Sequence, residues 1–245
     1  MTIRTGLIAI IGLALAHTAT AGPYCGGVTG WAPMGDTLPV RPMVVFWAED
    51  HITFTIKDAH VSHIEIPAFT ATIDGKRVLV TKRAERAGDI VLHYLQIESD
   101  RTGTLEIQHD ETLNDARVVH RETRTFTIVR DWNRAAPVAA VERFSQESAR
   151  MAERTYHGLA IVVDQALAFV VRWRRDAKDS WRAVVLPAMS QGGRSAAWLG
   201  ETDCNRADVP VSLLEQGIEL DATATFPDRK RIHVDGLEGR VKLPK

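Results

Sequence analysis

Short segments in which apolar and polar residues alternate run through most of this sequence. The clearest is residues 218–226 (IELDATATF), where every second position is apolar. A period of two residues places alternate side chains on opposite faces of a strand, so each segment predicts a strand with one buried face. Turn signals such as Asp74-Gly75 and Asp235-Gly236 fall between the segments. The pattern predicts an all-β protein.

A linker-like stretch divides these segments into two series. Residues 127–137 lose the alternation, carry Asp, Asn and Pro, and end in small residues. About seven predicted strands precede the stretch, at the spacing that is typical of a β-sandwich, and a second series follows it. We therefore expect two compact units, residues 22–132 and residues 138–245, with a hinge between them.

Three segments give more specific expectations. Met43–Trp47 is continuously apolar, which predicts a strand buried on both faces. Pro39 and Pro42 lack backbone N–H donors, so we expect their segment to touch a sheet only at its edge. Residues 138–154 contain good helix formers but fit helical spacing only in part, and both a short helix and an edge strand remain open for them.

In strand rhythm, each half resembles an immunoglobulin-like or fibronectin type III-like module of an exported bacterial protein. Trp173 lies where such domains often have a core tryptophan. The resemblance implies two β-sandwich domains and leaves the activity open, because sandwiches carry many unrelated functions. We expect Trp173 to point into a core with the apolar residues at 167, 169 and 171, while Arg172 and Arg174 face solvent.

The N-terminus has the features of a signal peptide. Arg4 is followed by the apolar run Leu7–Ala16 and by Ala19-Thr20-Ala21, an A-x-A cleavage site. The run is shorter than the roughly 20 residues that span a bilayer. We expect cleavage between Ala21 and Gly22, removal of residues 1–21, and export to the periplasm or the exterior with no transmembrane span in the mature chain.

The two cysteines, Cys25 and Cys204, are expected to form one disulfide, because export delivers them to an oxidising compartment. Bacterial lipoprotein signals, as a family pattern, place a small residue directly before the cysteine. Tyr24 stands there in this chain, so a lipid anchor on Cys25 is set aside.

No residue pattern identifies a metal or cofactor site, and we expect neither. His60 and His63 are three residues apart, which places them on opposite faces of a strand. The other histidines are scattered singly, and we interpret them as surface or edge residues. The segment Asp203–Asp208 gathers oxygen ligands but lacks the glycine and the distal Glu of a calcium loop.

Catalytic residues are not expected either. Gly193–Ala197 contains Ser195 in a near match to the nucleophile elbow G-x-S-x-G, but its last glycine is replaced by alanine and no helix of useful length follows. We interpret the match as belonging to a flexible Gln191-Gly192-Gly193 loop. Paired carboxylates of a glycosidase are not recognisable from sequence alone.

The formal net charge of −1 gives no electrostatic reason to expect nucleic acid as a partner. We therefore expect an exported, non-catalytic binding or scaffolding protein of the cell envelope or exterior, with a protein or glycan partner. A secreted hydrolase that uses Ser195 or carboxylates is one alternative. A structural subunit of a surface assembly, joined through exposed strand edges, is the other.

Overall fold

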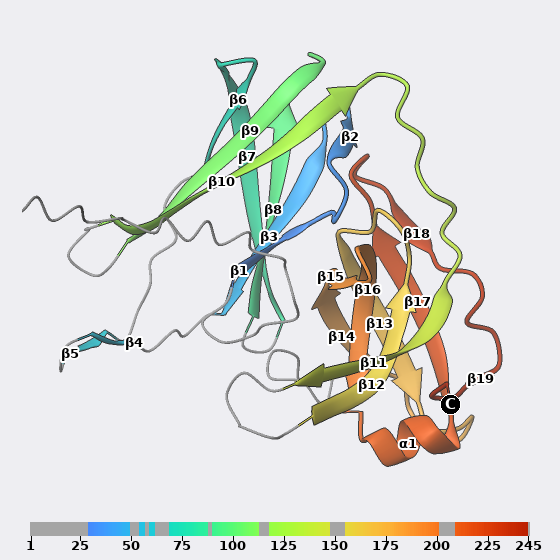
Figure 1. The fold of residues 1–245 in the computed structure, drawn as a ribbon. Coiled ribbons are helices and arrows are strands. Elements are labelled where there is room, and N and C mark those ends of the chain that lie inside the picture. The colour runs from blue at the N-terminus through green and yellow to red at the C-terminus, as the bar shows by residue number, and fades with distance from the viewer. Residues whose placement is uncertain are drawn as a thin grey trace, which may run out of the picture.

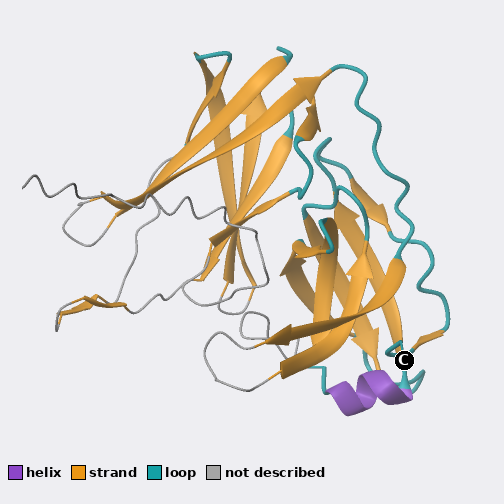
Figure 2. Cartoon of the chain, viewed as in Figure 1, coloured by secondary structure: helices purple, strands orange, loops and turns teal. Residues whose placement is uncertain are grey.

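The computed structural model describes residues 29–49, 54–56, 59–61, 69–87, 90–112, 118–147, 155–200 and 209–244. These residues are nearly all β, and their sheets form sandwich-like arrangements (Figures 1 and 2). The single α-helix among them, α1 (Val211–Gln216), has 6 residues. None of the described helices has the length and apolar character needed to cross a membrane.

In the first half, eight strands form one sheet in the order β1-β3-β8-β7-β6-β9-β10-β2. β4 (Phe54–Ile56) and β5 (Ala59–Val61) form a separate pair. The strands of the sheet are β1 (Thr29–Ala32), β2 (Thr37–Pro39), β3 (Met43–Glu49), β6 (Thr70–Ile73), β7 (Lys76–Ala87), β8 (Ile90–Glu98), β9 (Gly103–Thr112) and β10 (Val118–Val129).

This sheet closes over a core because the long strand β7 belongs to both of its layers. Residues 76–78 of β7 pair with β6, and residues 79–87 pair with β8. One apolar cluster fills the space enclosed, joining Phe46 of β3 and Leu95 of β8 to Ile107 of β9 and Phe126 of β10. The turn into β7 is formed by Asp74 and Gly75 at φ 49° and 73°, as the Asp-Gly signal predicts.

In the second half, a four-stranded sheet in the order β11-β12-β16-β15 faces a five-stranded sheet in the order β14-β13-β17-β18, with β19 paired to β17. The strands are β11 (Ala140–Glu147), β12 (Thr155–Val162), β13 (Ala168–Arg174), β14 (Arg182–Pro187), β15 (Met189–Gln191), β16 (Arg194–Gly200), β17 (Ile218–Thr225), β18 (Arg231–His233) and β19 (Arg240–Val241).

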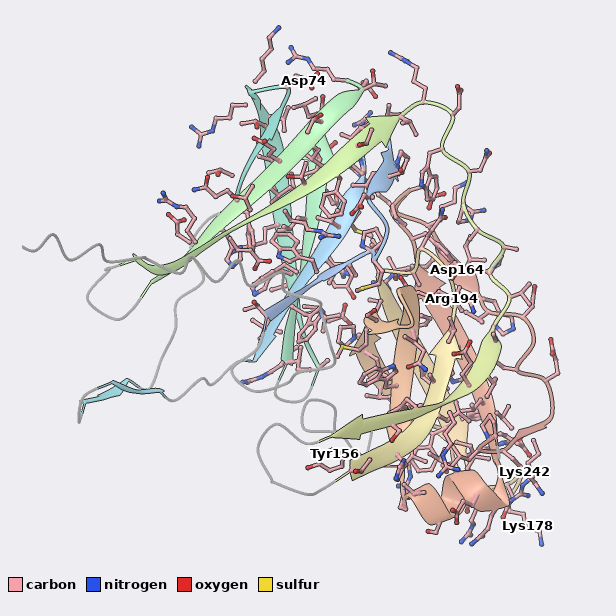
Figure 3. The ribbon with its side chains drawn as sticks, in the orientation of Figure 1. Asp74, Tyr156, Asp164, Lys178, Arg194 and Lys242 are labelled. Atoms are coloured by element: carbon pink, nitrogen blue, oxygen red, sulfur yellow. The ribbon has the colours of Figure 1, made fainter. Side chains whose placement is uncertain are left out.

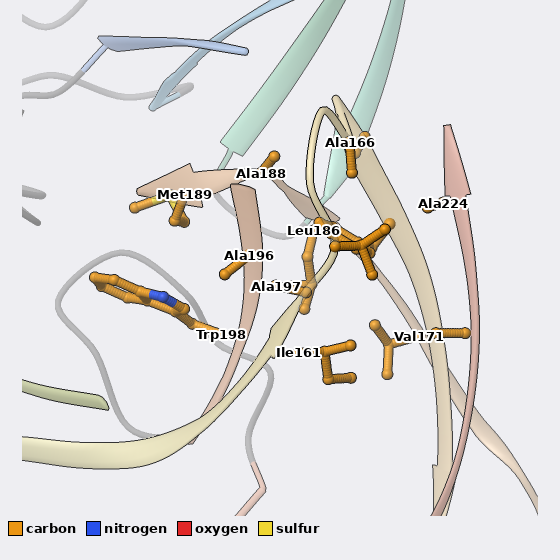
Figure 4. Packing of buried hydrophobic residues seen from close by; sticks show 14 of the residues in the cluster. Ile161, Ala166, Val171, Leu186, Ala188, Met189, Ala196, Ala197, Trp198 and Ala224 are labelled. Carbon is orange, nitrogen blue, oxygen red and sulfur yellow. The ribbon is translucent and has the colours of Figure 1, made fainter. Parts of the chain in front are cut away.

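Alternate residues of these strands fill the space between the two sheets. Ile161 of β12 and Val171 of β13 are directed toward each other there (Figure 4). Trp173 is only 6% exposed and belongs to the same cluster, whereas Arg172 is exposed. The predicted register of this strand is therefore confirmed, although Arg174 is only partly exposed.

The predicted two-sided burial of Met43–Trp47 is also confirmed. Val44 and Phe46 of β3 point into the core of the first half, while Val45 and Trp47 join the cluster of the second half. All four side chains are 5% exposed or less. The apolar run thus gives β3 one face for each half of the molecule, and the part of the interface that β3 forms is apolar.

Two other expectations have clear outcomes. Pro39 lies in β2, an edge strand that pairs in parallel with β10. The expectation that its segment touches the sheet only at the edge is therefore confirmed. Of residues 138–154, for which a short helix and an edge strand were both possible, residues 140–147 form strand β11 at the edge of the four-stranded sheet. Residues 148–154 lie outside the described residues.

The turn between β17 and β18 fastens the two halves through Arg229. Its guanidinium donates to the backbone oxygens of Arg41 (3.0 Å) and Ile97 (3.1 Å), and it pairs with Glu98 at 2.9 Å. In the same turn, Pro227 O accepts from Met43 N at 2.7 Å, and Asp228 pairs with Arg134 at 2.5 Å. This one turn of the second half therefore contacts both the first half and Arg134 of the predicted hinge.

Replacing Arg229 by Ala is expected to lower the free energy of unfolding by about 1–3 kcal/mol, because two backbone carbonyls lose a charged donor. Arg229→Lys should recover little of this, since one ammonium group lacks the planar fork that reaches several acceptors. Lys230→Ala, next to it in the turn, is the control. Denaturant unfolding measures all three, and an Arg229→Ala loss no larger than the control's would contradict the assignment.

Candidate functional site

Several predicted site residues lie outside the part of the chain that the structure describes. These are the signal cleavage pair Ala21 and Gly22, both cysteines of the expected disulfide (Cys25 and Cys204), the segment Asp203–Asp208, and His63. Signal cleavage and the disulfide therefore remain predictions.

Ser195 lies inside strand β16, two residues after the Gly192-Gly193 turn, and its side chain is 1% exposed. Its hydroxyl makes no hydrogen bond with any described residue. Its backbone is part of the sheet, since Ser195 O accepts from Val163 N at 2.9 Å. The residues around Ser195 thus form a strand that leaves a tight turn, whereas a nucleophile elbow needs a strand-to-helix turn that exposes the serine.

Two histidines correct the expectation of surface or edge positions. His93 of β8 and His109 of β9 are 9% and 1% exposed. They share one aromatic cluster in the core of the first half, where the rings of Phe46 and His109 are 4.4 Å apart and those of Phe69 and His93 are 5.9 Å apart. Burial, assisted by the charge of Lys82 and by His109, lowers the pKa of His93 to about 4.

This burial predicts a pH dependence of stability. The pKa of His93 in the folded chain, about 4, lies below its ordinary value of 6.5, so between these pH values the unfolded chain binds the extra proton. The free energy of unfolding should therefore fall as pH is lowered from 6.5 toward 4. In the His93→Phe variant it should fall less steeply over the same range. Urea unfolding across this range tests both, and a folded-state NMR titration of His93 with a midpoint near 6.5 would refute the account.

No group of three or more His, Cys, Asp or Glu residues suited to a metal ion occurs within the described ranges. Carboxylates line a cavity on the outer face of the five-stranded sheet, around Trp181.

Trp181 is placed there by the hairpin that joins β13 to β14. The hairpin pairs Trp173 with Arg182, and the preceding residue, Trp181, folds back over the outward-facing side chains of β13. Its ring centroid lies 5.0 Å from the guanidinium carbon of Arg172 and 4.6 Å from that of Arg174. Guanidinium groups stack on indole rings at this range, so the two arginines hold the half-buried ring in place.

Carboxylates of β17 hold the two arginines in turn. Arg172 is the cross-strand partner of Asp221 and pairs with it at 3.1 Å, while Arg174 is the partner of Glu219 and pairs with it at 2.5 Å. Opposite charges on directly paired residues stabilise a sheet. The result is an ordered row of two guanidiniums, two carboxylates and one indole ring.

The indole ring and the two carboxylates of this row line a cavity of about 330 Å³, which we call the Trp181 cleft. Residues 237–240 form its other wall, and there the pKa of Glu238 is held below its ordinary value by backbone N–H groups of Glu238 and Gly236. Arg240 donates to Gly217 O at 3.0 Å. The cleft is lined by Trp181, Glu219, Leu220, Asp221, Leu237, Glu238, Gly239 and Arg240.

The cleft therefore combines an aromatic wall with fixed hydrogen-bond donors and acceptors. Sequence analysis did not predict this cleft, because it expected Arg172 and Arg174 only to face solvent. The available signal was the alternation itself, since residues 172 and 174 share one strand face and residues 219 and 221 share another. The pairing of these two strands was not visible in the sequence.

No protein-family model matches this chain, and no curated protein is significantly similar to it in sequence. The chemistry of the Trp181 cleft therefore carries the functional proposal.

Proposed function

We propose that the protein is an exported, non-catalytic binding protein of the cell envelope or exterior, and that its ligand is a glycan bound in the Trp181 cleft. The export rests on the predicted signal peptide, residues 1–21. The observation that carries the binding site is the half-buried Trp181 ring beside an ordered set of carboxylates and guanidiniums.

A sugar ring matches this arrangement because it has an apolar face of C–H groups and a rim of hydroxyl groups. The face packs on an aromatic ring, and each hydroxyl both donates to carboxylates and accepts from guanidiniums. The volume of about 330 Å³ falls at the lower end of ligand pockets, which suits a short oligosaccharide segment.

A protein ligand is less well matched to the described surface. Stable protein interfaces bury roughly 800 Å² on each partner and have an apolar centre. Leu79 and Val138 are the exposed large apolar side chains of the described residues, and they lie in different halves of the molecule. Single exposed apolar residues do not form a docking patch.

The finer architecture belongs to the same proposal. We infer two immunoglobulin-like or fibronectin III-like β-sandwich domains, residues 22–132 and residues 138–245, joined by residues 133–137. The turn that carries Arg229 and the apolar contact through β3 support a fixed orientation of the two domains. Such an orientation suits a scaffold that presents the cleft at a defined position.

The proposal is tested by applying the exported protein to an array of neutral and uronic-acid-bearing oligosaccharides, with Trp181→Ala as the variant. Loss of the aromatic wall should weaken binding by about tenfold or more, equivalent to about 1.4 kcal/mol. Trp132→Ala removes a half-buried tryptophan outside the cleft and is the matched control. Absence of any bound oligosaccharide, or equal binding by Trp181→Ala, would refute the proposal.

The same samples test the hydrolase alternative. Release of new reducing ends from a bound oligosaccharide, abolished by Glu219→Gln or Asp221→Asn, would show that the cleft is catalytic. We expect no release, because each of these carboxylates is engaged by the arginine opposite it.

A further inference from the structure

A second cavity, of about 280 Å³, lies on the other side of residues 180–182 from the Trp181 cleft. It sits at the end of the molecule where the β13–β14 hairpin reaches α1, marked in Figure 3 by Lys178 and Lys242. We call it the Arg182 pocket. Its walls are Trp173, Arg174, Arg175, Asp179, Ser180, Arg182 and Leu213.

Two of its three guanidiniums already have carboxylate partners. Arg174 is bound by Glu219, the residue that also lines the Trp181 cleft. Arg175 pairs with Asp179 at 3.1 Å and approaches Asp176 at 3.5 Å. Both side chains are therefore committed to contacts within the protein.

Arg182 differs from these two arginines. Among the described residues no carboxylate pairs with it, and its guanidinium carbon lies 4.8 Å from the ring centroid of Trp173. Stacking fixes the plane of a guanidinium while leaving the N–H groups on its edge free to donate. Arg182 is thus an oriented cation that faces the cavity and forms no ion pair with a described carboxylate.

The ligand group that best fits such a cation is a carboxylate. Two parallel N–H donors of one guanidinium match the two oxygens of a planar carboxylate, and this pairing is among the stronger hydrogen-bonded contacts. Three carboxylates lie beside the guanidiniums of the pocket, those of Asp176, Asp179 and Glu219, and Asp179 is part of the wall itself. A dianion such as a phosphate ester would therefore meet more repulsion there than a single carboxylate.

We propose that the Arg182 pocket binds the carboxylate of a uronic acid residue in the glycan whose neighbouring ring packs against Trp181. This inference rests on the proposed function and specifies its ligand as an acidic glycan. Arg174 lines the Arg182 pocket and its ion-pair partner Glu219 lines the Trp181 cleft, so the two cavities adjoin at this pair, and the proposal places one oligosaccharide across both. Leu213 and Trp173, which line the pocket, supply the apolar contact for the ring that carries the acid.

The test compares two ligands that differ only at the acid, trigalacturonic acid and its fully methyl-esterified form, by calorimetric titration of the exported protein. The wild type should bind the acid about tenfold tighter or more, as expected for one charge-assisted bidentate contact. Arg182→Gln should bind both forms equally. Arg182→Lys keeps the charge without the planar fork and should recover only part of the difference.

Arg77→Gln, an exposed change of the same charge on β7 of the first half, is the control and should bind like the wild type. Denaturant unfolding of each variant shows whether Arg182→Gln remains folded; if it does not, the Arg182→Lys result decides.

Equal affinity of the wild type for acid and ester would overturn the carboxylate site while leaving glycan binding intact. Tighter binding of a sulfated oligosaccharide, or of an acidic peptide without sugar, would also overturn it. Binding of neither form, together with an empty array, would instead refute the glycan proposal itself.

Discussion

Replacing Trp173 by Ala is expected to lower the free energy of unfolding by about 3–5 kcal/mol, the range for large aromatic side chains removed from a core. Trp173 is 6% exposed and packs in the cluster that fills the second half. It also supports the guanidinium of Arg182 at the end of the sandwich. The substitution therefore removes core packing and loosens one wall of the Arg182 pocket.

Trp181→Ala is the matched control, because it removes the same side chain from a half-buried position on the outer face of the same sheet. Its loss should be clearly smaller. A loss below about 1 kcal/mol for Trp173→Ala in denaturant unfolding would contradict the position assigned to Trp173, because truncation of a buried aromatic residue costs more than a typical surface substitution.

The second large effect is expected from the disulfide between Cys25 and Cys204. These are the only cysteines of the chain, and the bond would close a loop of about 180 residues. The chain-entropy model places the stabilisation near 5 kcal/mol as an upper limit, because such a bond restricts the unfolded chain. It would link the segment around Cys25 to the second half of the chain, in addition to the contacts of Arg229.

Peptide mapping of the exported protein without reduction should recover one cross-linked peptide that contains both residues. Reduction should then lower the denaturant midpoint, and a Cys25→Ser, Cys204→Ser double variant should match the reduced protein. Two titratable thiols in the unreduced, denatured protein would disprove the bond and leave the apolar interface and the Arg229 turn as the links between the halves.

Strand positions were predictable because local alternation determines which face of a strand is buried. The continuous apolar run of Met43–Trp47 correctly predicted two buried faces, and the alternation around Trp173 correctly predicted its inward direction. In contrast, α1 was not predicted, because its 6 residues are too few to show a helical period.

The buried histidines were misjudged although the same alternation applied to them. His93 shares its strand face with Leu95 and Ile97, and His109 shares its face with Leu105 and Ile107. The period of two residues was the better guide, because burial in a strand follows the face more strictly than the polarity of one residue.

The candidate site could not be predicted, because it depends on contacts between distant parts of the chain. Arg174 and Glu219 are 45 residues apart and meet only through the pairing of β13 with β17. Trp181 reaches them through the β13–β14 hairpin, whose register sets which side chains it covers. Local pattern determines the face of each strand, whereas the order of strands in a sheet depends on the whole fold.

The most direct test of the central claim follows the tryptophans themselves. The chain has six tryptophans, and 5-fluorotryptophan labelling gives each a fluorine resonance, with that of Trp181 assigned by its absence in Trp181→Phe. Titration with trigalacturonic acid should shift the Trp181 resonance in a saturable way and leave those of the buried Trp31 and Trp47 unchanged. A saturable shift confined to other tryptophans, or no shift at all, would contradict a glycan site at Trp181.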